Sequence, residues 1–201
     1  MSDNIPSLRL PVALTVLVLA ALALSGLNPY DRLTWALEVV PVLIVLPWTW
    51  AGARRFPLTP LLQVLLAVHA IVLIAGGAWS YARVPFGFWL QDVFDLSRNP
   101  YDKIGHFLQG VTPALFMREH LLRSERVRGA GLAAVLSVSV ALAFSAIYEL
   151  IEWISALLLG QGADEFLGTQ GDVWDTQSDM AMALLGAVLA LTLIRRRWTA
   201  A

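Results

Sequence analysis

The sequence predicts an all-α integral membrane protein, a bundle of about six transmembrane helices that forms a single polytopic membrane domain over residues 1–201. Three observations lead to this prediction. Of the 201 residues, 58% are hydrophobic and only 14% are charged, which is not the balance of a soluble domain. Several apolar runs reach the roughly 20 residues that a helix needs to cross a bilayer. The chain has neither the alternation of a β-strand nor an internal repeat.

Four spans follow directly from apolar runs, and two more are inferred because polar residues interrupt them. Polar groups inside a span are costly and should face the bundle interior, so the two weaker spans are the informative ones. We expect the first span to be retained, because Arg9 is the one basic residue before it and its apolar stretch is long for a signal peptide. The plain spans are Leu10–Leu27, Leu33–Trp50, Leu58–Trp79 and Ala130–Leu159, and the inferred ones are Tyr101–Leu122 and Asp175–Ile194.

The charges are distributed unevenly between the two sides of this bundle. With six spans, ten of the 14 basic residues fall on the side of the termini. The positive-inside rule therefore predicts a multi-pass protein of a bacterial cytoplasmic (inner) membrane with both termini in the cytoplasm. Eleven of the 15 acidic residues fall on the other side, where they would attract cations. Membrane lipids are the expected surroundings, and the net charge of −1 gives no reason to expect nucleic acid as a partner.

Three polar segments stand at the predicted outer end of the bundle, where they enter the fourth span, leave the fifth and enter the sixth. Residues three or four positions apart project from one helix face. At about 1.5 Å per residue, His106 lies about 7 Å below the start of its span, Glu152 about 10 Å below the end of its own, and Asp179 about 10 Å below Asp172. The sets would meet in one layer if the helices are neighbours. They are Asp102 with His106, Glu149 with Glu152, and Asp172 with Asp175 and Asp179.

Close carboxylates in a partly dehydrated pocket cannot all be ionised unless protons or cations compensate them. A divalent metal is therefore the candidate cofactor. The chain has no cysteine, so the strong ligands are His, Asp and Glu, and a mixed oxygen and nitrogen set suits Zn, Mn or Fe. The candidate metal ligands are His106, Asp172, Asp175 and Asp179. The candidate catalytic residues are Glu149 or Glu152 as general base and Asp102, which would orient the imidazole.

Simpler roles are open for each of these residues. His106 is also interpretable as a hydrogen-bond partner at a helix interface, and Asp172 and Asp175 as N-terminal caps of the sixth helix. Lys103 or Arg98 would then hold the two glutamates as structural polar groups.

The same polar segments resemble the YjdF family of uncharacterised bacterial inner-membrane proteins. The resemblance covers nearly the whole chain, through Arg98–Gly110, Arg118-Glu119, Ser145–Trp153 and Phe166–Met180. It implies a membrane protein of unknown function. More distantly, Asp102-Lys103 with His106-Phe107, together with Gly186-Ala187, is similar to the VanZ-like family linked to glycopeptide resistance, which implies a role at the cell envelope. The chain departs from that pattern at Tyr148–Trp153 and around Trp174.

Three classes of function fit these observations. The leading hypothesis is a metal-dependent membrane hydrolase or transferase that acts on a lipid-linked or envelope substrate at the outer leaflet. The second is a cation or proton transport or binding protein, in which Glu38 and His69 would extend the path. The third is a structural or partner-binding envelope protein that uses the outer loop Gly160–Trp174.

Overall fold

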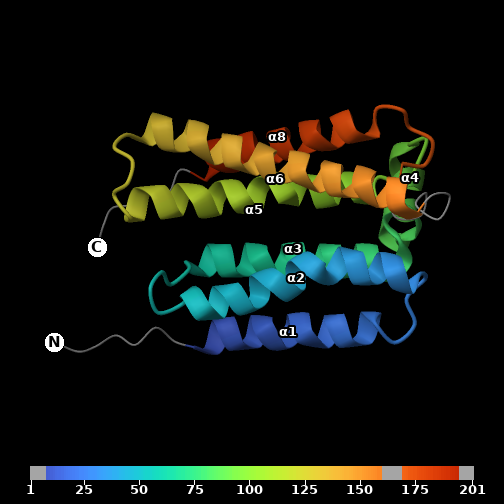
Figure 1. The fold of residues 1–201 in the computed structure, drawn as a ribbon, viewed down its shortest axis with the longest axis horizontal. Coiled ribbons are helices and arrows are strands. Elements are labelled where there is room, and N and C mark those ends of the chain that lie inside the picture. The colour runs from blue at the N-terminus through green and yellow to red at the C-terminus, as the bar shows by residue number, and fades with distance from the viewer. Residues whose placement is uncertain (1–7, 160–168, 195–201) are drawn as a thin grey trace. The chain divides into compact units, whose positions relative to one another are not determined.

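The computed structural model describes residues 8–159 and 169–194, and the regular structure in these two ranges is entirely helical (Figure 1). A short 3₁₀ helix, η1 (Tyr81–Arg83), precedes α4. The predicted all-α class is therefore confirmed for this part of the chain. Most of the predicted outer loop, residues 160–168, lies outside the described residues. The α-helices are α1 (Arg9–Ser25), α2 (Arg32–Gly52), α3 (Pro60–Trp79), α4 (Pro85–Phe94), α5 (Tyr101–Arg123), α6 (Ala130–Leu159) and α8 (Asp175–Leu193).

Four of these helices, α2, α3, α6 and α8, are long and apolar enough to cross a membrane. Helix α1 is apolar but shorter, with 17 residues. Helix α5 has 23 residues but carries charged side chains near both ends, among them Asp102, Lys103 and Arg118. The multi-pass architecture is confirmed to this extent, whereas the count of six spans and the cytoplasmic position of the termini stay predictions.

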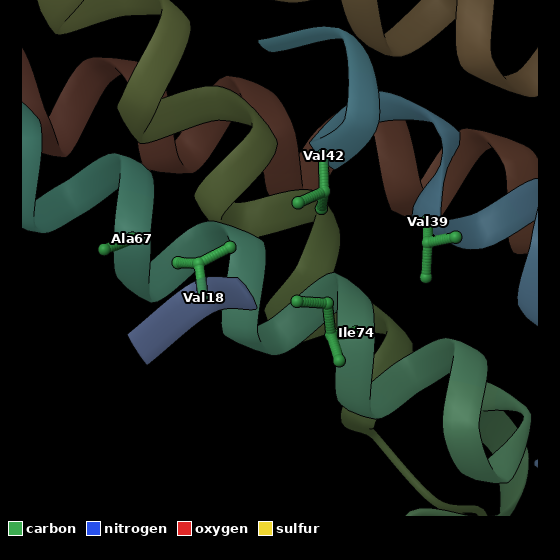
Figure 2. Close-up of a cluster of buried hydrophobic side chains, with 5 residues drawn as sticks. All are labelled: Val18, Val39, Val42, Ala67 and Ile74. Atoms are coloured by element: carbon green, nitrogen blue, oxygen red, sulfur yellow. The ribbon is translucent and has the colours of Figure 1, made fainter. Parts of the chain in front are cut away.

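The chain divides into two compact units, Met1–Ala78 and Trp79–Ala201. The single membrane domain stays a prediction. In the first unit, α1, α2 and α3 lie side by side (Figure 1). Their shared core is small and aliphatic, and Figure 2 shows its side chains, which come from all three helices. This core consists of Val18 of α1, Val39 and Val42 of α2, and Ala67 and Ile74 of α3.

The second unit is built around α5, which packs against both α6 and α8, and these two also pack against each other. The three helices that carry the polar motifs are therefore neighbours. Helices α5 and α8 meet backbone to backbone, since a Cβ added to Gly110 would lie 1.9 Å from the Ala183 carbonyl oxygen. A Cβ on Gly186 would lie 2.2 Å from the carbonyl oxygen of Phe107. Small residues commonly permit such close contact between membrane helices.

Candidate functional site

Asn99 fixes the start of α5 and is almost completely buried, with 2% of its surface exposed. Its side-chain nitrogen donates to the carbonyl oxygen of Val84 at 3.0 Å, and its side-chain oxygen accepts from the backbone N–H of Tyr101 at 3.0 Å. Gly87 leaves room for it, because a Cβ there would lie 1.8 Å from the Asn99 oxygen. The Gln170 side chain exchanges two hydrogen bonds with the Asn99 backbone, at 3.1 Å and 2.9 Å. The segment before α8 is thereby attached to the start of α5.

Arg98 makes the second connection between these segments. Its guanidinium donates to the carbonyl oxygen of Thr169 at 2.7 Å and lies 3.0 Å from Asp172 and 2.6 Å from Asp175. Burial works against the charged form of Arg98, but the Asp175 carboxylate outweighs it, so the pKa of Arg98 is raised above its usual value. Arg98 is therefore a permanent cation that neutralises part of the acidic charge at the start of α8.

Lys103 lies deeper and joins the same helices by ion pairs. Its Nζ is 2.8 Å from Oδ1 of Asp175 and 2.6 Å from Oδ1 of Asp179, and it lies 3.9 Å from Oδ2 of Asp102. Asp179 is 1% exposed, so its carboxylate has almost no access to solvent. Without the ammonium group or another cation, burying this carboxylate in charged form would be strongly unfavourable.

His106 lies at the centre of the cluster, with 4% of its surface exposed. On one side of the ring, Nε2 is 3.5 Å from Oδ1 of Asp102 and 3.8 Å from Oδ1 of Asp179. On the other side, Nδ1 is 3.0 Å from Oε1 of Gln109 and 3.6 Å from Oε1 of Glu149. That glutamate oxygen is buried and makes no hydrogen bond. The imidazole therefore lies between acidic groups of three helices.

Asp102, His106 and Asp179 form a group that could hold a metal ion. Each residue offers one ligand atom, these atoms lie within 4.8 Å of one another, and all three residues are buried. Ligands about 2.1 Å from a tetrahedral ion are about 3.4 Å apart, close to the 3.5 Å and 3.8 Å separations from Nε2. If Nδ1 of His106 carries the ring proton, it donates a hydrogen bond to Oε1 of Gln109, and Nε2 keeps a lone pair that could bind a metal. This arrangement is typical of metal-binding histidines.

The remaining predicted residues lie on α6 and at the start of α8. Glu149 and Glu152 are buried on α6, with 6% and 9% of their surfaces exposed. Asp172 and Asp175 engage the two basic side chains described above, and the backbone N–H of Trp174 also donates to Asp172 at 2.9 Å. The assignment of ligands and catalytic groups among these residues stays a prediction. The geometry favours Asp102 over Asp172 and Asp175 as a neighbour of the His106 ring nitrogen.

Gln109 and Asn99 are the residues whose roles sequence reasoning missed. Gln109 is three positions after His106, and residues three apart share a helix face as residues four apart do, so helical spacing could have found it. Asn99 directly precedes Pro100 at the start of a predicted helix, where side-chain caps are common. Its contact with Gln170 joins segments 71 residues apart and had no signal in the sequence.

The fold and the cluster together define a class, helical membrane proteins with a buried group of carboxylates and one imidazole. The family described as "Predicted membrane protein (DUF2238)" matches residues 10–200, and the chain belongs to it. The chain is 58% identical over 172 residues to "Inner membrane protein YjdF" of Escherichia coli (strain K12), covering 86% of this chain and 82% of that protein. The predicted resemblance to the YjdF family is therefore confirmed.

This relative and the apolar helices also support the predicted multi-pass location in the cytoplasmic membrane. No solved structure matches the chain. The distant resemblance to the VanZ-like family stays a prediction, as does the extracytoplasmic position of the site.

Proposed function

We propose that the chain binds one divalent metal ion through Asp102, His106 and Asp179 and uses it as a membrane-embedded hydrolase or transferase. The observation that carries this proposal is the convergence of three buried ligand atoms within 4.8 Å of one another. Gln109 supports the metal-binding tautomer of His106 at 3.0 Å. Zn, Mn and Fe are the metals that suit such a mixed set of ligands.

Glu149 is the residue we propose as general base. It is buried, and its Oε1 lies 3.6 Å from Nδ1 of His106 and makes no hydrogen bond. This oxygen would be able to accept a proton, and a bound metal ion would supply the activation of water. Glu152 lies nearly one turn farther along α6, toward the helix end. Because the cluster lies inside a bundle of membrane helices, the substrate class that fits is a lipid-linked or envelope molecule that reaches the site from the extracytoplasmic leaflet.

Metal content tests the binding step directly. The full chain, purified in detergent, should contain close to one transition metal ion per chain by elemental mass spectrometry. His106→Ala and Asp179→Ala should each lower that content at least about tenfold, whereas Asp172→Asn, outside the proposed ligand group, should keep it. Wild-type protein without metal after incubation with Zn, Mn and Fe would refute the proposal.

The orientation is testable because the chain has no natural cysteine. Val173, directly before Trp174 and α8, is 86% exposed, and Arg126 is exposed between α5 and α6. A membrane-impermeant maleimide should label Val173→Cys in intact cells and Arg126→Cys only after permeabilisation. The reverse pattern would place the site on the cytoplasmic side.

A second candidate function, cation or proton transport or binding, is favoured by the excess of buried carboxylates over buried basic groups. Glu38, buried in α2, and His69 of α3 belong to the other unit of the chain. If this candidate is correct, reconstituted vesicles should show proton or cation flux that Glu149→Gln abolishes. A metal-dependent enzyme without flux would exclude transport.

A further inference from the structure

A groove between α1, α2 and α3 in the first unit has no part in the cluster described above. It encloses about 540 Å³, a volume within the roughly 300–1,000 Å³ typical of small-molecule sites. Its inner part is aliphatic and is lined by Leu14, Val18, Val42, Ala67 and Ala70. Such a surface suits a hydrocarbon chain and offers nothing to a polar metabolite.

The other end of the groove is polar. Gln63 lines it in the first turn of α3, and its Nε2 donates to the carbonyl oxygen of Leu58 at 2.9 Å. Its Oε1 is buried and has no hydrogen-bond partner. A buried acceptor without a donor is unfavourable, so the Gln63 side chain would gain a hydrogen bond by turning this oxygen toward a ligand donor in the groove. Gln63 lies seven residues before Ala70, which is about 10 Å along the helix. The groove is therefore polar near Gln63 and aliphatic near Ala70.

The charge at this end is positive. Arg54 lines the groove and is exposed, and Arg9 and Arg55 lie at the same end of the unit, where α1 begins and α2 is followed by α3 (Figure 1). Within the described part of the first unit, the acidic residues are Asp31 and Glu38, at the start and in the second turn of α2. An anionic head group placed beside Arg54 would therefore meet attraction without a competing carboxylate.

From these three properties we propose that the groove binds one anionic phospholipid whose head group carries a hydrogen-bond donor. One acyl chain occupies the aliphatic part between Val18, Val42 and Ala67. The phosphate lies beside Arg54, and a hydroxyl of the head group donates to Oε1 of Gln63. Phosphatidylglycerol has this combination of negative charge and hydroxyl donors, whereas phosphatidylcholine has neither a net charge nor a donor.

Native mass spectrometry of the detergent-purified full chain tests the proposal, with phosphatidylglycerol or phosphatidylcholine added at equal concentration. The wild type should retain one phosphatidylglycerol at least about tenfold more strongly than phosphatidylcholine. Ala70→Phe, which fills the groove, should lower this retention at least about tenfold. Val68→Phe is the matched control, because Val68 is 45% exposed on α3 and does not line the groove.

Two polar variants separate the head-group contacts from general folding. Arg54→Ala should remove most of the preference for phosphatidylglycerol, whereas Arg55→Ala, with the same change in charge beside the groove, should keep it. Gln63→Leu should lower retention of phosphatidylglycerol severalfold. This variant provides an independent test if the Ala70→Phe protein fails to fold. Equal retention of both lipids by the wild type, or unchanged retention in Arg54→Ala and Gln63→Leu, would overturn the proposal.

Discussion

Replacing Gly110 by alanine should destabilise the helix pair that holds the site. The added Cβ would lie 1.9 Å from the carbonyl oxygen of Ala183 and 2.7 Å from its carbonyl carbon, both backbone atoms that no side-chain rotation can move. Real Cβ contacts are essentially never closer than 3.0 Å, so α5 and α8 must separate by about 1 Å. Gly186→Ala should act in the same way, because its Cβ would lie 2.2 Å from the carbonyl oxygen of Phe107.

The size of the effect follows from two opposing contributions. Alanine favours a helix over glycine by about 1 kcal/mol, whereas overpacking a tight interface costs about 2–3 kcal/mol, the upper part of the usual range, when backbones must shift. A net loss of about 1–2 kcal/mol corresponds to a decrease in melting temperature of roughly 2–8 °C for a chain of this size. The separation of the helices should also lengthen the Lys103–Asp179 ion pair, which joins α5 to α8 at 2.6 Å.

Thermal unfolding in detergent, followed by tryptophan fluorescence, measures this change. Gly131→Ala is the matched control, because Gly131 also lies in a helix of the second unit and a Cβ there would have no atom within 4 Å. The control should unfold at the wild-type temperature or slightly above it. A Gly110→Ala protein as stable as the Gly131→Ala protein would refute the close backbone contact between α5 and α8.

Three further predictions concern individual polar contacts. Lys103→Gln removes a cation 2.6 Å from Asp179 and should tighten binding of an added divalent metal at least about tenfold in a titration; weaker binding would show that the lysine supports the ion. Asn99→Ala loses the contacts to Val84 and Tyr101 and should lower stability by about 1–3 kcal/mol in thermal unfolding. Asp31→Ala removes the cap of α2, where the side chain accepts from the Thr34 N–H at 2.7 Å, and should cost about 1 kcal/mol. The hydrogen bond from the Thr34 backbone lowers the folded-state pKa of Asp31, so the charged cap stabilises fully above the usual value of 3.8. The difference between wild type and Asp31→Ala should therefore shrink as the pH falls below that value, and a constant difference would contradict the role of the charge.

The helix boundaries were predictable because they depend on local properties of the chain. The predicted span Ala130–Leu159 is α6 itself, and Leu33–Trp50 differs from α2 by one residue at its start and two at its end. Apolar length sets the extent of each span, and a local cap such as Asp31 sets its start. Span count and orientation depend on the bilayer, and the contacts within the chain do not determine them.

The site was predictable only as a set of helix faces. Spacing identified His106 and Asp179 as inward residues, and both are buried together. Spacing could not predict that Asp175 would pair with Arg98 and Lys103, because this pairing depends on the axial position of α8 relative to α5. That register is set by glycine contacts between residues more than 70 positions apart, which no local pattern encodes.

The distribution of charge within the cluster explains why a cation or a shared proton is needed. Arg98 and Lys103 lie against the first turns of α8, where they reach Asp172, Asp175 and Asp179. Among the described residues, Asp102 and Glu149 have His106 as their close basic neighbour, besides the 3.9 Å contact of Lys103 to Asp102. A singly charged imidazole cannot balance two buried carboxylates, and an unbalanced buried charge costs several kcal/mol. A divalent ion at Nε2 would balance Asp102 and Asp179 and release Lys103 to Asp175, whereas Glu149 would still need a proton. Metal content and the Lys103→Gln titration together therefore distinguish a metal site from a cluster that only shares protons.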